Sequence, residues 1–275
     1  MAGREIREPI HGFIHLEESE IEIIDKPIFQ RLRRIKQLAF AHLVYPGAMH
    51  TRFDHSLGAR HVAASMGQAL GLGNEEIRWV RLTALLHDLG HGPFSHVSEN
   101  LLARFAKPEI IRDQGLEEIH ELITMQLIQD KSLPLSDLER ERIIGILLTE
   151  NGAKRELMVK FLKVKDRPPD PVLKQIISGP LDADKQDYLL RDSYFCGVKY
   201  GIFDMARLHN TLESESEPAV GKILAISEDG VHAVEQYVMA KYYMNTQVYR
   251  HRVRLATDAM LTRAMERLCP LCGGN

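Results

Sequence analysis

The stretch LLHDLGHGPFSH, residues 85–96, places metal-binding and proton-transferring side chains within an otherwise apolar sequence. Residues 77–89 are mostly apolar or small, and this pattern predicts a helix that is buried on most of its sides. His87 and Asp88 are carried inward with that helix. An ionised carboxylate in such surroundings costs several kcal/mol unless it is paired with another charge or bound to a cation. We therefore expect a metal ion at this point of the chain.

The alternative is a purely structural His-Asp pair at the end of a helix. Asp88 would then form a salt bridge and His87 would be a hydrogen-bonded core histidine, which is the commoner arrangement for an isolated pair. The rest of the sequence favours a metal site, because His55 and Asp184 complete a set of two imidazoles and two carboxylates on different predicted helices. Such a set suits Mn, Fe, Zn, Ni or Mg and does not select among them.

The composition is that of a globular protein without a strong charge bias. The 275 residues are 44% hydrophobic and 27% charged, and the formal net charge of −3 provides no overall attraction to nucleic acid or to an anionic membrane. No apolar run reaches the ~18 residues that span a bilayer, and residues 1–5 lack the apolar centre of a signal peptide. The sequence predicts a cytoplasmic protein that does not enter membranes.

The chain is predicted to be mainly helical, with a few short strands. Alternating residues predict strands over residues 10–16 and 42–47, and a hairpin is expected from residues 207–212 and 222–227 around an acidic loop. A basic helix is expected to begin at Pro27. Amphipathic patterns predict helices over residues 97–105, 116–129, 138–148, 155–161, 171–177 and 182–192, and one long helix over residues 231–267.

No linker or shift in composition divides the chain, so residues 1–267 are predicted to form one domain. Residues 268–275 contain Cys269 and Cys272 in a Cys-x-x-Cys pattern, which is half of a zinc knuckle. No second pair accompanies them in the sequence, since Cys196 is isolated. We expect this terminal segment to be unstructured or truncated.

Four stretches of the sequence resemble the HD-domain phosphohydrolases, whose metal ligands occur in the order His, His-Asp, Asp. They are residues 29–38 (FQRLRRIKQL) with the preceding Asp25, residues 52–58 (RFDHSLG), residues 87–96, and residues 184–188 (DKQDY). Within that superfamily the chain is most similar to deoxynucleoside triphosphate triphosphohydrolases, of the type joined in vertebrates to a sterile-alpha-motif domain. The resemblance implies an HD-domain helical bundle. The family's C-terminal half, which is regulatory and oligomerising, has no counterpart in this sequence.

The resemblance also implies catalytic roles. The family's metal ligands match the four metal-site residues chosen above. Its phosphate-contacting or proton-donating histidines match His91, His96 and His120. The family pairs the last of these with an aspartate, for which this chain has Glu99.

Further matching positions would bind nucleotides. Leu38 corresponds to a residue that crowds the ribose 2′ position, while Lys241 and Asn245 replace an arginine and a histidine of the family. Asp25, Gln30 and Arg33 match residues that bind an activating guanine nucleotide, although Arg7 replaces the usual asparagine beside them. The positions that would bind substrate are Gln37, Leu38, Arg52, Lys185, Tyr188, Asp192, Lys241, Asn245 and Tyr249.

The sequence thus predicts a metal-dependent hydrolase that converts a deoxynucleoside triphosphate to deoxynucleoside and inorganic triphosphate. One alternative is an HD phosphohydrolase or phosphodiesterase acting on another nucleotide or a signalling phosphoester. The other is a non-catalytic module that binds nucleotides or single-stranded nucleic acid, since residues 31–36 are basic and would allow weak nucleic-acid binding. The resemblance further implies a homo-oligomer.

Overall fold

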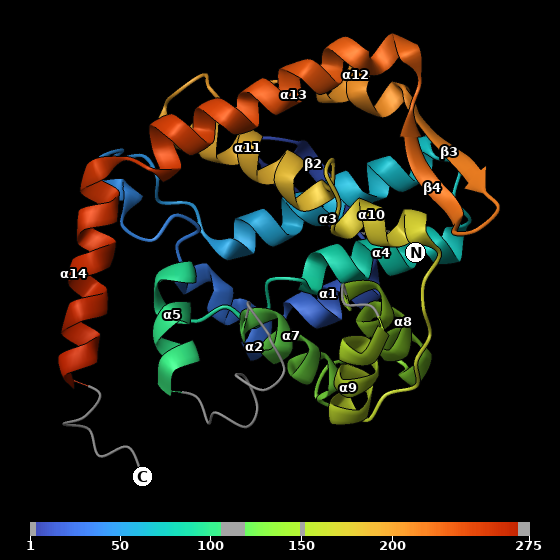
Figure 1. Cartoon of the computed structure of the whole chain (residues 1–275), viewed down its shortest axis with the longest axis horizontal. Helices are drawn as coiled ribbons and strands as arrows, with labels where there is room; N and C mark the ends of the chain where they lie inside the picture. Colours follow the sequence, from blue (N-terminus) through green and yellow to red (C-terminus); the bar gives the residue numbers. More distant parts are fainter. Residues whose placement is uncertain (1–3, 106–118, 149–151, 269–275) are drawn as a thin grey trace.

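The structure, a computed structural model, describes residues 4–105, 119–148 and 152–268, and it is mainly helical (Figure 1). The strands form two separate two-stranded antiparallel sheets within these residues. In chain order the elements are β1 Arg4–Glu8, β2 Gly12–Leu16, α1 Glu18–Ile24, α2 Pro27–Gln30, the 3₁₀ turns η1 Arg31–Arg34 and η2 Ala41–Leu43, α3 Arg52–Ala69, α4 Asn74–Leu86, α5 His96–Phe105, α7 Ile119–Gln129, α8 Asp137–Leu147, α9 Gly152–Leu162, α10 Pro171–Ile177, α11 Ala183–Cys196, α12 Met205–Asn210, β3 Leu212–Glu217, β4 Gly221–Ile226, the 3₁₀ turn η3 Glu228–Gly230, α13 Val231–Met244, the π-helical turn η4 Asn245–Tyr249 and α14 Arg252–Leu268.

Helix α3 lies at the centre of the fold and packs against both α4 and α11 (Figure 1). Its start is fixed by a capping box, in which the Thr51 hydroxyl accepts from the Asp54 backbone N–H and the Asp54 carboxylate accepts from the Thr51 backbone N–H. Gly58 allows α11 to approach closely, because a Cβ at this position would overlap the side chains of Asp187 and Arg191. These three helices carry or border all four of the predicted metal ligands.

Helix α4 is buried as its apolar sequence predicts. Leu82, Leu85 and Leu86 are fully buried in a core cluster that also includes Ile14 of β2. Burying each of these side chains stabilises the fold by about 2 kcal/mol. The helix ends at Leu86, with His87 as its C-cap, so the His-Asp pair follows the helix rather than lying inside it. The pair is nevertheless held at the edge of the core.

The predicted strand over residues 42–47 is not formed. The backbone closes local hydrogen bonds instead, from the Leu43 N–H to the Phe40 carbonyl and from the Val44 N–H to the Ala41 carbonyl. No strand in the described part of the chain pairs with this segment, so an extended backbone would leave its polar groups without partners. The predicted basic helix is also shorter than expected, since α2 ends at Gln30 and the chain continues as the 3₁₀ turn η1.

Two C-terminal predictions are wrong in their boundaries. The hairpin is present, but its first strand is the acidic segment β3 rather than residues 207–212, because α12 begins at an Asp204 cap that accepts from the Arg207 N–H. The expected long helix is divided by the π-helical turn η4 into α13 and α14. Cys269 and Cys272 lie outside the described residues, and the terminal tail stays a prediction. None of the helices within the described ranges combines the length and apolarity needed to cross a membrane.

A buried histidine makes the fold sensitive to acid. His209 of α12 lies between the Ser65 hydroxyl, 2.8 Å from its Nδ1, and the Gln186 amide oxygen, 2.8 Å from its Nε2. Burial lowers the pKa of His209 from 6.5 to about 4, with smaller contributions from His61 and His11. Between these two values the unfolded chain binds a proton that the folded chain does not, so stability falls as the pH is lowered from 6.5 toward 4.

We expect His209→Gln to flatten this pH dependence. At neutral pH the variant loses stability because it loses packing and hydrogen bonds, but near pH 4 it escapes a protonation penalty of about 3 kcal/mol. Urea unfolding midpoints measured from pH 7 to pH 4.5 give the slope directly. His232→Gln is the control, because the His232 side chain is 91% exposed. Equal slopes for His209→Gln and the wild type would contradict this assignment.

Candidate metal and phosphate site

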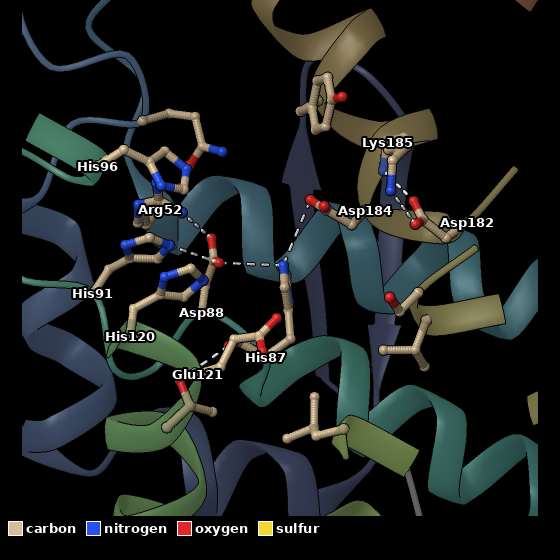
Figure 2. Close-up of a pocket in the computed structure, with 16 residues that line it drawn as sticks. Arg52, His87, Asp88, His91, His96, His120, Glu121, Asp182, Asp184 and Lys185 are labelled. Carbon is tan, nitrogen blue, oxygen red and sulfur yellow. Dashed lines mark hydrogen bonds and ion pairs between the residues drawn. The ribbon is translucent and has the colours of Figure 1, made fainter. Parts of the chain in front are cut away.

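A cavity of about 300 Å³ opens beside the C-terminal end of α4 and brings together half of the predicted site residues (Figure 2). Its walls come from the segment before α3, from α3, the segment after α4, α5, α7, α8, α10 and the first turns of α11. The lining residues are Gln37, Arg52, His87, Asp88, His91, His96, His120, Glu121, Thr124, Leu147, Ile177, Ser178, Asp182, Asp184, Lys185 and Tyr188.

Three of the four predicted metal ligands, His87, Asp88 and Asp184, line this cavity, and the fourth, His55, is buried directly against them. His55 Nε2 lies 2.9 Å from Asp184 Oδ1 and 3.7 Å from Asp88 Oδ2. His87 Nε2 lies 3.4 Å from Asp88 Oδ1 and 3.6 Å from Asp184 Oδ1. Both imidazoles therefore direct the same ring nitrogen at the same two carboxylates, as the ligands of a single divalent cation would.

Contacts at Nδ1 fix the orientation of both imidazoles. His55 Nδ1 lies 2.7 Å from Asp187 Oδ2, and His87 Nδ1 lies 2.7 Å from the carbonyl oxygen of Ala84. These contacts place the N–H of each ring at Nδ1 and the lone pair at Nε2, which is how metal-binding histidines are usually held. Both Nε2 atoms are buried and make no hydrogen bond of acceptable geometry. The residues therefore fit a divalent metal ion.

The charges of the site agree with a cation. Burial opposes ionisation of Asp88, but Arg52, His87 and His91 outweigh it and hold the pKa of that carboxyl well below its usual range. Burial likewise opposes protonation of His55, yet the neighbouring carboxylates of Asp184 and Asp187 raise its pKa to about 10. Binding a metal would displace this proton, because only the neutral imidazole is a ligand.

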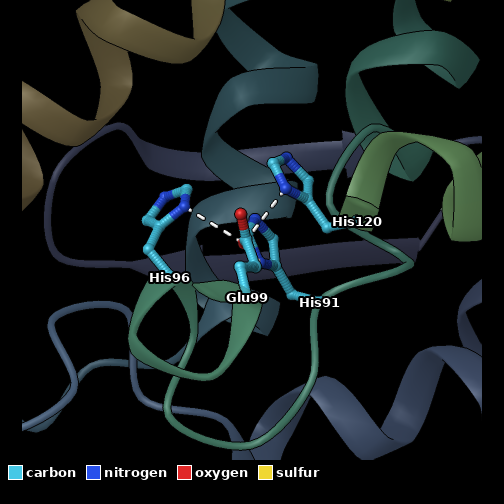
Figure 3. Close-up of side chains that lie close together, drawn as sticks. All are labelled: His91, His96, Glu99 and His120. Carbon is cyan, nitrogen blue, oxygen red and sulfur yellow. Dashed lines mark ion pairs between the residues drawn. The ribbon is translucent and has the colours of Figure 1, made fainter. Parts of the chain in front are cut away.

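Three histidines surround one carboxylate at the far side of the cavity (Figure 3). The Nδ1 atoms of His91, His96 and His120 lie 3.0, 3.1 and 3.0 Å from the same Oε1 of Glu99. Burial opposes ionisation of Glu99, but the three neighbouring rings outweigh it and lower the pKa of its carboxyl. Burial lowers the pKa of His91 to about 4. Glu99 thus occupies the place that the sequence predicts for it, beside His120.

Two cationic side chains line the cavity, each beside a carboxylate. Arg52 donates to Asp88 through Nη1 and to the Ser95 hydroxyl through Nε, the latter at 2.9 Å. Lys185 pairs with Asp182 one turn earlier, and Asp182 also caps the start of α11. Both cations are therefore placed where an anionic ligand in the cavity would meet them.

Four of the predicted substrate-binding residues are divided between the cavity and the core. Gln37 and Tyr188 line the cavity. Leu38, by contrast, is buried in a core cluster with Leu189 and does not line the cavity. Asp192 is buried one turn beyond Tyr188, where His50 Nε2 lies 2.8 Å from its Oδ1 and the Tyr249 hydroxyl donates to its Oδ2 at 2.7 Å.

The remaining predicted residues do not line the cavity. Lys241 and Asn245 are exposed near the end of α13. The three predicted activator residues lie along α1, α2 and η1: Asp25 is exposed, Gln30 donates to the Ile24 carbonyl, and the Arg33 guanidinium lies over the Phe53 ring at 3.5 Å. Their binding role stays a prediction.

The structure adds residues that sequence reasoning missed. Asp187 accepts from both Arg191 Nε and Nη2 at 2.9 Å, and His11 Nε2 lies 2.7 Å from its Oδ1, while its other contact is to His55. Thr124 of α7 holds the backbone on both sides of Asp88 by hydrogen bonds. Its hydroxyl donates to the His87 carbonyl and accepts from the Gly90 N–H. Asp187 and Arg191 are four residues apart on one helix, and this spacing could have predicted their ion pair.

Comparison with known proteins identifies the family. Residues 52–180 match the HD domain and residues 203–271 match the HD associated region. This chain is an HD-domain protein. The first match includes His55, His87 and Asp88, whereas Asp184 lies between the two matched regions and is brought to the site by α11.

The HD-domain chain has relatives in distant organisms. It is 36% identical to the uncharacterized protein MJ1154 of Methanocaldococcus jannaschii, over 94% of this chain and 49% of that protein. It is 33% identical to the deoxynucleoside triphosphate triphosphohydrolase SAMHD1 of Homo sapiens, over 94% of this chain and 44% of that protein. The chain spans about half the length of these curated relatives.

Solved structures confirm the mainly helical HD-domain fold. A hypothetical protein from Aquifex aeolicus is similar with a TM-score of 0.76 and 34% identity, over 97% of this chain and 65% of that chain. A phosphohydrolase (BT4208) from Bacteroides thetaiotaomicron is similar with a TM-score of 0.72 and 32% identity, over 94% of this chain and 57% of that chain.

Proposed function

We propose that this HD-domain chain is a metal-dependent hydrolase that cleaves a deoxynucleoside triphosphate to deoxynucleoside and inorganic triphosphate. The observation that carries the proposal is the arrangement of one cavity, in which a site that fits a divalent cation faces Arg52, Lys185 and three histidines. The similarity to human SAMHD1 supports this class of substrate. A divalent cation would acidify a water molecule and offset the charge that develops on phosphate oxygens.

The chain's own residues would bind the triphosphate. Arg52 presents a planar guanidinium that can form paired hydrogen bonds with phosphate oxygens, and Lys185 adds a compact positive charge. Asp88 and Asp182 already hold these two cations at the cavity wall. Little side-chain ordering is then needed when the substrate binds, so more of the electrostatic attraction is available to stabilise the transition state.

The three histidines around Glu99 would supply protons. A nucleoside 5′ oxygen is a poor leaving group, so its departure from phosphorus needs a proton donor within hydrogen-bond reach. His91, His96 and His120 all line the cavity, and Glu99 contacts the Nδ1 of each ring. Through these contacts the carboxylate would hold the three rings in place at the cavity.

Hydrolysis of a different nucleotide phosphoester is the second candidate. The position of Leu38 favours it, because a side chain packed in the core does not by itself exclude a ribose 2′ hydroxyl from the cavity. Gln37 and Tyr188 remain as cavity residues able to contact a sugar. Both candidates use the same metal site and the same cations.

A substrate panel separates the two candidates. With Mn²⁺ or Mg²⁺ present, we expect the purified chain to release inorganic triphosphate from dGTP and the other deoxynucleotides, with roughly a hundredfold preference over the matching ribonucleotides. Chromatography of the phosphate products and of the nucleosides measures both the bond and the sugar preference. Equal turnover of dGTP and GTP, or faster release of phosphate from a nucleoside monophosphate, would count against a deoxynucleotide pocket.

A further inference from the structure

The three histidines and Glu99 have the composition and spacing of a metal site of their own. The ligand-type atoms of His91, His96, Glu99 and His120 all lie within 4.8 Å of one another. The three Nδ1 atoms surround one carboxylate oxygen rather than both oxygens of the group (Figure 3). We propose that these four side chains bind a second metal ion, zinc, at a site separate from that of His55, His87, Asp88 and Asp184.

The observed spacing is close to that of a four-coordinate zinc ion. Bonds of ~2.0–2.1 Å arranged tetrahedrally separate neighbouring ligand atoms by ~3.3 Å. The three nitrogen-to-oxygen separations here are 3.0 to 3.1 Å. The stacked rings of His91 and His120 would have to rotate relative to each other for both to direct Nδ1 at one ion.

Hydrogen bonds alone satisfy this cluster poorly. His91 is 1% exposed, and neither of its ring nitrogens makes a hydrogen bond of acceptable geometry; Glu99 Oε1 makes none either. The rings of His91 and His120 are stacked with centroids 3.8 Å apart. A metal ion would give His91 Nδ1 and Glu99 Oε1 the partner that hydrogen bonds do not provide.

The two sites share no ligand. His91 lies between them, with Nε2 3.3 Å from Asp88 Oδ1 and Nδ1 3.0 Å from Glu99 Oε1. The second site differs from the first in its donors, since it offers three imidazoles and one carboxylate where the first offers two of each. The nitrogen-rich set favours zinc over magnesium, whereas the first site also suits Mg²⁺ or Mn²⁺.

Zinc at the second site would oppose the proposed hydrolysis. An imidazole bound to a metal through Nδ1 is no longer an imidazolium, so it does not serve as a proton donor to the leaving oxygen. This consequence rests on the proposed function, while the binding of zinc does not. The cluster would accordingly have two states, one protonated and able to act, and one occupied by zinc and inhibited.

The test counts metal ions on the folded chain. The purified protein is saturated with Mn²⁺, titrated with Zn²⁺ at neutral pH, separated from free metal and analysed by elemental analysis. We expect about two metal ions per wild-type chain and about one in His96→Ala. His96 is 62% exposed, so its replacement leaves the core intact, and circular dichroism checks the fold.

A matched control is present in the same chain. His232 Nδ1 lies 2.9 Å from Glu235 Oε2 with the same three-residue spacing as His96 and Glu99, but it lies on an exposed surface. His232→Ala should keep both metal ions, whereas His87→Gln should lose the first and keep zinc at the second. Co²⁺ in place of Zn²⁺ gives the same count and adds the visible absorption bands of a four-coordinate site.

The possible results distinguish a failure of the second metal site from a failure of the proposed function. A single metal ion per wild-type chain in excess zinc would overturn the proposal, as would an unchanged metal content in folded His96→Ala. Loss of both ions in His96→Ala would overturn the separation of the two sites. Zinc binding without any dNTP hydrolysis would support the second site and refute the proposed function, so the two failures are distinguishable.

Discussion

Replacing His87 and Asp88 together by alanine is expected to remove the first-site metal and to lower hydrolysis by more than about a thousandfold. The two side chains supply one imidazole and one carboxylate of the four groups that converge in the cavity. The two groups that remain, His55 and Asp184, form an incomplete site for any of the divalent cations considered. Arg52 would remain near that point, but a guanidinium does not acidify a water molecule as a divalent cation does.

The double substitution also tests a structural cost. Asp88 is 4% exposed and accepts from Arg52, which is buried as well. Removing the carboxylate leaves the guanidinium without its partner, at a cost of about 3–5 kcal/mol. Because such a variant could lose activity by unfolding, His87→Gln is the second variant: it leaves the Arg52–Asp88 pair intact and removes one metal ligand.

The measurements are elemental analysis of the purified chain, the rate of triphosphate release, and circular dichroism. We expect His87→Gln to be folded, depleted of metal at the first site and inactive. His15→Gln is the control, since that side chain is 74% exposed and its contact is with Glu5 on the neighbouring strand. A folded His87→Gln variant with full activity and no detectable metal would refute the metal mechanism.

Part of the candidate metal site could be predicted from the sequence because its chemistry is local and unusual. An apolar helix that ends in His87 and Asp88 needs a cation or an ion pair, and the structure shows that both occur, since Asp88 faces Arg52 as well as the two histidines. That His55 and Asp184 converge on the same point depends on how α3 and α11 pack. The resemblance to a family supplied that information, and spacing along the chain did not.

The sequence does not show which side chains of the predicted sugar pocket face the cavity, because side-chain direction depends on turns. Gln37 and Leu38 are adjacent, yet Gln37 lines the cavity and Leu38 enters the core. The backbone turns at Ala39, whose φ is 45°, an uncommon value for a residue with a side chain. No periodicity reveals such a turn. The predicted strand over residues 42–47 is absent for a related reason. Polar and apolar residues alternate there, but no strand among the described residues pairs with the segment, and a local pattern does not show this.

The last prediction concerns the bond that breaks. We expect water to attack the α-phosphorus and the three phosphates to leave the nucleoside as one unit. If Arg52 and Lys185 bind the outer phosphates, we expect the α-phosphate to lie beside the first metal site, whose His87, Asp88 and Asp184 line the same cavity (Figure 2). The leaving group is then the nucleoside 5′ oxygen.

This geometry demands a proton donor, and the cavity offers two with different surroundings. His120 is 10% exposed and packs against the His91 ring, whereas the His96 side chain is 62% exposed at the start of α5. Both contact Glu99 through Nδ1. We expect replacement of the true donor by asparagine to slow triphosphate release by about a hundredfold or more, while leaving the first-site metal in place. Replacement of the other histidine should have a smaller effect.

Hydrolysis in oxygen-18 water identifies the bond, because the labelled oxygen is found on the phosphorus that was attacked. Mass spectrometry should find the label in inorganic triphosphate and none in the deoxynucleoside. His96→Asn and His120→Asn are compared under the same conditions with His232→Asn as the control, since His232 lies on the exposed surface of α13. Label in the nucleoside, or orthophosphate or pyrophosphate as the initial product, would show that a different bond is cleaved and that these histidines have another role.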